Sequence, residues 1–169
     1  MAPGPHRRAT VVVVAAVVAT ATACSSGLAV PVPSPAPTGA AAYACAALHG
    51  VLPDEVVGAS VTPTKPQSPL TSAWGSPAIV FRCGVGVPAA LTPTSQLVVV
   101  DGVSWLPEQL SQGYLFTTVG RVLTVEVSVP DHYAPEADVL ADLSPVIATQ
   151  IPVVGDGATG SRSPSPSAS

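Results

Sequence analysis

The sequence predicts a small α+β domain: a two-layer sandwich with an antiparallel sheet of four or five strands, an N-terminal and a C-terminal helix, and one disulfide. Apolar and polar residues alternate over residues 123–129, the pattern of a strand with one buried face. Asp101 and Gly102 stand between two apolar runs, and this dipeptide favours a hairpin turn. Apolar residues recur at helical spacing over residues 139–147, and such a stripe is buried only against the sheet.

The first predicted element is a helix over residues 40–49, because Gly50 suits the position just after a helix and His49 would meet the negative end of the helix dipole. Residues 54–57 can start another helical turn after Pro53. Four prolines predict an irregular loop over residues 62–77.

Strands are predicted next, followed by a helix. Their ranges are 79–83, 96–100, 103–105, 114–118 and 121–129. Val119 and Gly120 mark a second hairpin between the last two strands. Pro135 and Glu136 open the C-terminal helix, which Pro145 can kink or split.

The N-terminus has the pattern of an export signal. Arg7 and Arg8 precede residues 9–23, which contain only Ala, Val and Thr and fall short of the ~20 residues that span a bilayer as a helix. Small residues stand directly before Cys24, as in bacterial lipoproteins, so Cys24 is the expected lipid attachment site. Cleavage after Ala23 by an ordinary signal peptidase, giving a secreted protein, is the alternative.

This pattern divides the chain into four parts and sets its location. They are a signal peptide over residues 1–23, a lipid-anchored proline-rich spacer over 24–42, a globular α+β domain over 43–152 and a disordered tail over 153–169. Alternating prolines favour an extended spacer that lifts the domain off the bilayer. We expect the protein on the outer face of the cytoplasmic membrane, with the membrane as its first partner through the N-terminal lipid.

The chain has three cysteines, and lipidation of Cys24 leaves Cys45 and Cys83 to form a disulfide in an oxidising compartment. Without the signal peptide, four basic residues face ten acidic ones, a net charge of −6. No basic patch remains, which argues against nucleic acid as a partner and against purely electrostatic binding to anionic lipid.

Residues 73–85, with the pattern Ala-Trp-Gly-x-Pro followed by Arg-Cys-Gly-Val, resemble an actinobacterial family of exported proteins and lipoproteins filed as a domain of unknown function. Further similar segments are Cys45 with Leu48 and residues 52–53, and residues 100–105, 117–121 and 127–130; together they cover residues 43–151. Ala78 and Asp101 depart from the family pattern, which commonly has proline and asparagine there. The resemblance implies export and the cysteine pair, and it implies no reaction or ligand.

No catalytic group is expected. After the signal peptide the chain contains only two histidines, His49 and His132, and it lacks the Gly-x-Ser-x-Gly motif of many hydrolases. Acidic residues around His132 match no known metal-site spacing, so neither a metal nor another cofactor is expected.

The candidate binding residues are Trp74, Arg82, Trp105 and Arg121. Arginine is rare in this domain and could pair with a ligand carboxylate or phosphate, while Trp74 in a proline-rich loop could contact a partner. In the alternative, the arginines form salt bridges to Glu126 or Asp101 and both tryptophans lie in the core.

These observations predict a non-catalytic binding or accessory module of the cell envelope, whose partner is an envelope protein, a glycan or a lipid. The alternative is an enzyme, or a subunit of one, acting in envelope metabolism through Arg82, Arg121 and nearby carboxylates.

Overall fold

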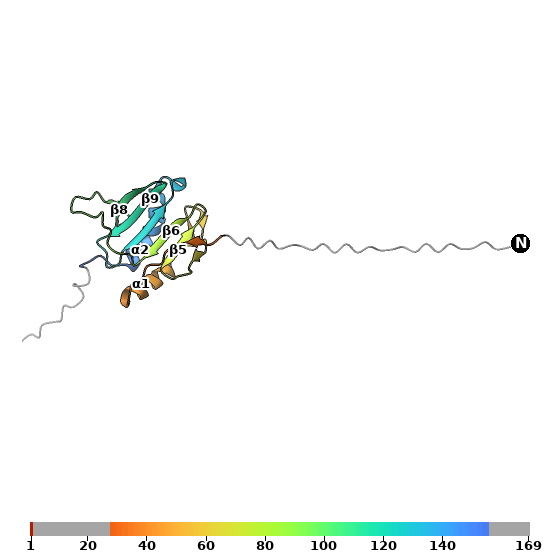
Figure 1. Ribbon diagram of the computed structural model, residues 1–169, viewed down its shortest axis with the longest axis horizontal. Helices are drawn as coiled ribbons and strands as arrows, with labels where there is room; N and C mark the ends of the chain where they lie inside the picture. The colour runs from red at the N-terminus through yellow and green to blue at the C-terminus, as the bar shows by residue number, and fades with distance from the viewer. Residues whose placement is uncertain (2–27, 156–169) are drawn as a thin grey trace, which may run out of the picture.

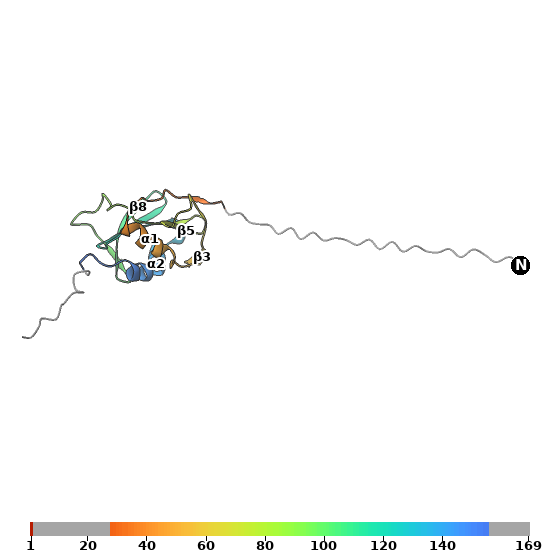
Figure 2. The same cartoon turned by 90° about the horizontal axis from the view of Figure 1, so that it is seen from below.

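The computed structural model describes Met1 and residues 28–155. A six-stranded antiparallel sheet in the order β5-β6-β10-β9-β8-β7 forms its centre, and α1 and α2 lie together on one side of that sheet (Figures 1 and 2). The sheet strands are β5 (Thr71–Trp74), β6 (Ile79–Cys83), β7 (Val98–Val100), β8 (Val103–Leu110), β9 (Gly113–Val119) and β10 (Val125–Val129). The predicted α+β fold is confirmed, and its main sheet has six strands where four or five were expected.

The core lies between the sheet and the two helices, α1 (Ala40–His49) and α2 (Glu136–Gln150). Alternate residues of β10 are fully buried, as the sequence pattern predicts, and so are four residues of the apolar stripe of α2: Val139, Leu140, Leu143 and Ile147. Pro145 lies inside α2, which continues through it to Gln150. The 3-10 helix η1 (Asp131–Tyr133) connects β10 to α2. None of the helices in residues 28–155 combines the length and hydropathy needed to cross a membrane.

The predicted disulfide is confirmed. Cys45 on α1 bonds Cys83 on β6 with their Cα atoms 5.6 Å apart, and both residues are fully buried. The bond therefore joins the N-terminal helix to a central strand of the sheet.

Both hairpin predictions agree with the pairing of the strands. Asp101 and Gly102 have φ of 45° and 75°, which is the type I′ geometry that joins β7 to β8. β9 and β10 pair antiparallel as expected. The sequence analysis missed the long β8–β9 hairpin, because β8 continues through Pro107 to Leu110.

Residues 54–57 do not start a helix, contrary to expectation. They enter a hairpin of β2 (Glu55–Val56) and β3 (Ala59–Ser60), with positive φ at Val57 and Gly58. The side chain of Asp142 on α2 accepts a 2.7 Å hydrogen bond from the Val57 N–H. Gly50 has a φ of −69°, so the end of α1 does not use the left-handed glycine conformation.

Residues 62–77 are more ordered than the proline count predicts. They contain β4 (Thr64–Lys65) and the whole of β5, which pairs with β6. The prolines bracket β5 rather than interrupt it, since none lies between Thr71 and Trp74. Local proline content therefore gave the wrong prediction for this strand.

The N-terminal segment of the described chain is part of the fold. β1 (Val30–Pro31) pairs parallel with β4, and Val32 is 2% exposed. The Oγ atoms of Ser34 and Ser68 lie 2.8 Å apart. These residues belong to the stretch predicted as a spacer. The predicted signal peptide, Cys24 and most of the predicted tail lie outside the described residues.

Candidate functional site

Trp74 is a core residue. Its side chain is fully buried, its Nε1–H donates a 2.9 Å hydrogen bond to the Pro53 carbonyl, and its ring meets Phe81 edge to face at 6.4 Å. The expectation of a surface contact at Trp74 was wrong because this residue ends a strand instead of lying in a loop, and its side chain points to the helices.

Trp105 is also fully buried, and its Nε1–H donates to Ser144 Oγ on α2 at 3.1 Å. The indole thus joins β8 to the C-terminal helix. Both tryptophans have a satisfied N–H group, as buried indoles require. Neither of them offers a surface to a ligand.

Arg82 pairs with Glu126, directly opposite on β10, with 2.8 Å between Nε and Oε1. This is the salt bridge that the structural alternative predicted. The two side chains are 28% and 18% exposed, so the pair contributes on the order of 0.2–1 kcal/mol.

Arg121 binds main-chain carbonyls. Its guanidinium donates to the Ile151 carbonyl and, at 2.8 Å, to the Gly102 carbonyl. Partial burial lowers the pKa of Arg121, since desolvation disfavours the charged form. This side chain connects the β7–β8 turn to the end of α2. The structure therefore brings neither arginine toward the other nor toward a shared carboxylate.

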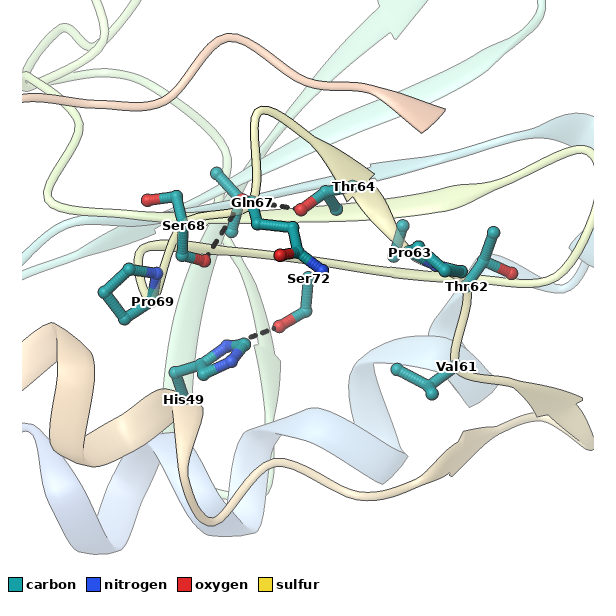
Figure 3. A pocket seen from close by; sticks show the side chains of 11 residues that line it. His49, Val61, Thr62, Pro63, Thr64, Gln67, Ser68, Pro69 and Ser72 are labelled. Atoms are coloured by element: carbon teal, nitrogen blue, oxygen red, sulfur yellow. Dashed lines mark hydrogen bonds between the residues drawn. The ribbon is translucent and has the colours of Figure 1, made fainter. Parts of the chain in front are cut away.

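The best candidate site is a cleft of about 560 Å³ at the β5 edge of the sheet (Figure 3). The segment before β5 pairs with it, since the Thr62 N–H donates to the Ala73 carbonyl at 2.8 Å. The chain then makes a loop through residues 63–70 and returns as β5. Residues of this loop and of β5 line the cleft together with His49 from the end of α1.

His49 and Ser72 meet across the cleft. His49 Nδ1 lies 2.9 Å from Ser72 Oγ, and Figure 3 shows both side chains pointing toward each other. Ser72 is 5% exposed, whereas His49 is exposed. Within residues 28–155, no carboxylate forms a hydrogen bond with His49, so the third group that orients a catalytic histidine is missing from this contact.

Most of the other polar side chains in the lining carry hydroxyl groups, and they stand among apolar residues. Thr64 Oγ1 and Thr71 Oγ1 lie 3.3 Å apart, and Thr71 also reaches the Ser68 carbonyl at 3.4 Å. Thr62 and Gln67 add a hydroxyl and an amide. Among residues 28–155, no carboxylate, lysine or arginine lines the cleft. These groups both donate and accept hydrogen bonds, so they suit an uncharged polar ligand.

The sequence analysis missed this cleft. Ser72 and Thr64 were not singled out, and His49 was interpreted only as a helix end. The available signal was the density of hydroxyl residues in 62–72, where Thr or Ser occupies five of eleven positions. In the described part of the chain, no three His, Cys, Asp or Glu side chains are grouped to hold a metal ion.

Comparison with known proteins gives a family and no function. No curated protein and no solved structure matches the chain. A family model described as "Protein of unknown function (DUF3515)" matches residues 8–154, which is most of the sequence. The chain therefore belongs to the DUF3515 family.

Proposed function

We propose that the protein is an exported lipoprotein of the cell envelope whose domain binds a neutral glycan in the cleft formed by β5, the loop over residues 63–70 and His49. The observation that carries the proposal is the lining of the cleft, which combines hydroxyl, amide and imidazole groups with no carboxylate or permanent cation. A neutral sugar presents both donors and acceptors and needs no charged partner. Val61, Pro63 and Pro69 supply the apolar surface on which sugar C–H groups pack.

Binding rather than catalysis agrees better with the state of Ser72. A nucleophilic serine needs an accessible hydroxyl and a base oriented by a third group. Ser72 is almost fully buried, and the His49 ring nitrogen nearest to it is Nδ1. The enzyme alternative based on Arg82 and Arg121 has less support, since both arginines are engaged with groups of the domain itself.

Replacement of Ser72 with alanine is expected to weaken glycan binding about tenfold, since it removes the buried hydroxyl that holds the exposed His49 ring in place at the cleft. The affinity is measured by titration with neutral oligosaccharides released from the envelope of the source cells. The ¹H–¹⁵N chemical shifts of residues 68–73 report binding. Ser104→Ala on β8 is the matched control, because Ser104 lies on a strand outside the cleft.

Two outcomes contradict this proposal. Shifts spread evenly over the domain, or equal affinities for Ser72→Ala and Ser104→Ala, would place binding elsewhere. Covalent labelling of Ser72 by a fluorophosphonate probe would instead support the enzyme alternative, because the probe reacts with nucleophilic serines.

The lipid anchor is the second part of the proposal. Cys45 and Cys83 bond each other, so Cys24 has no other cysteine in this chain with which to pair. Cys24→Ser is expected to move the protein from the membrane fraction to the soluble fraction and to remove an acyl-sized mass increment from the intact protein. An unmodified Cys24 in membrane-derived native protein would contradict lipidation.

A further inference from the structure

The chain becomes part of the fold only a few residues after Cys24. The Val30 N–H donates to the Pro63 carbonyl at 2.8 Å, and the Val32 N–H donates to the Lys65 carbonyl at 3.0 Å. Val32 is buried, so β1 is fixed to the domain by packing as well as by hydrogen bonds. The residues from Val30 onward are therefore held by the domain, although the sequence predicts a spacer up to residue 42.

The length of the tether between Cys24 and β1 limits the distance between the domain and a membrane. Four residue steps separate Cys24 from Leu28, and six separate it from Val30. At ~3.5 Å per residue for a fully extended chain, these steps span at most about 14 Å and about 21 Å. A lipid on Cys24 would therefore hold the β1 edge of the domain close to the bilayer surface.

The surface at this edge is hollowed and uncharged. A hollow of about 680 Å³ is lined by residues that include Leu28, Val30, Pro31, Val61 and Ala78. Leu28 is 93% exposed and Val61 is 57% exposed. We call this surface the β1 face. No charged side chain of the described residues lines it.

Charged residues of both signs lie next to the β1 face. Lys65, the single lysine of the chain, pairs with Pro31 across β1 and β4. Glu55 accepts a 3.2 Å hydrogen bond from Ser60, which lines the hollow. Contact with a bilayer would therefore depend on apolar side chains and on the short tether. Electrostatic attraction to anionic lipid is not needed, which agrees with the net negative charge of the chain after the signal peptide.

We propose that the β1 face lies against the bilayer in which Cys24 is anchored, with Leu28 and Val61 in the headgroup region. The inference rests on the lipid attachment proposed above. The two coloured ends of the described domain lie on opposite sides of it (Figures 1 and 2). The glycan cleft shares Val61 and Thr62 with the hollow, so it would open beside the membrane surface.

The test uses the full-length lipidated protein in phosphatidylcholine vesicles that carry a headgroup nitroxide quencher. An environment-sensitive fluorophore is attached through Val61→Cys, and through Val99→Cys as the control. Val99 is 66% exposed on β7, and five strand spacings of ~4.8 Å separate β7 from β5 across the sheet. We expect at least threefold stronger quenching at position 61 than at position 99.

A substitution then tests the apolar contact itself. Leu28→Ser is expected to reduce quenching at position 61 at least twofold, while Leu110→Ser, on β8 four strand spacings from β5 and also exposed, leaves it unchanged. Equal quenching at positions 61 and 99, or no effect of Leu28→Ser, overturns the inference while the anchor stands. Failure of the protein to float with the vesicles, together with an unmodified intact mass, refutes the lipid anchor and with it this orientation.

Discussion

Replacement of Trp74 with alanine is expected to lower the free energy of unfolding by about 3–5 kcal/mol, the usual cost of removing a large buried aromatic side chain. Trp74 is fully buried at the end of β5, where it packs against Phe81. Alanine would leave a cavity, and it would also leave the Pro53 carbonyl without its 2.9 Å hydrogen bond. The residue therefore supports the fold, and a loss of binding in this variant would report unfolding.

Urea unfolding followed by far-ultraviolet circular dichroism measures the change. Tyr43→Ala is the matched control: this aromatic residue lies on α1 with 80% of its surface exposed, and its loss is expected to change stability by less than ~0.5 kcal/mol. Trp74→Phe, which keeps most of the apolar volume but not the N–H, is expected to lie between the two. Equal unfolding midpoints for Trp74→Ala and Tyr43→Ala would contradict the core assignment.

The parts of the fold that follow from local pattern could be predicted. Residues 40–49 form the predicted helix, and the alternation in residues 125–129 corresponds to the buried and half-buried residues of β10, although the strand begins four residues later than the predicted range 121–129. Asp101 and Gly102 form the expected turn because their conformational preference is intrinsic to the two residues. In each case, the signal lies within a window of about ten residues.

The parts that depend on distant partners could not be predicted. β5 is a strand because it forms hydrogen bonds with β6. The four nearby prolines made the local sequence look like a loop. β1 exists only because the Pro63 and Lys65 carbonyls accept its N–H groups. Proline alternation in residues 31–37 predicts an extended chain, but it does not say whether that chain is free or packed.

The candidate site was missed for the same reason. His49 and Ser72 are 23 positions apart, and their contact depends on where α1 ends relative to β5. Arg82 and Trp74, by contrast, were predicted as binding residues because arginine and tryptophan are rare in this chain. Rarity identified residues that stabilise the domain, whereas the cleft is built from common threonines, serines and prolines.

Removal of the disulfide through Cys45→Ala and Cys83→Ala together is expected to destabilise the domain by about 4 kcal/mol. The bond links residues that are 38 positions apart in the sequence. Closing a loop of this length restricts the unfolded chain, and loss of the bond favours the unfolded state by roughly that much free energy. Typical domains have a total stability of about 5–15 kcal/mol, so the loss would remove between about a quarter and four fifths of it. Alanine is preferred to serine because both positions are fully buried and a hydroxyl there would lack a partner.

Thermal and urea unfolding of this variant should agree with those of the reduced wild-type domain, which controls for the change in side-chain volume. A midpoint close to that of the oxidised wild type would mean that packing of α1 against the sheet alone holds the N-terminal helix in place, and that the bond is not needed for stability.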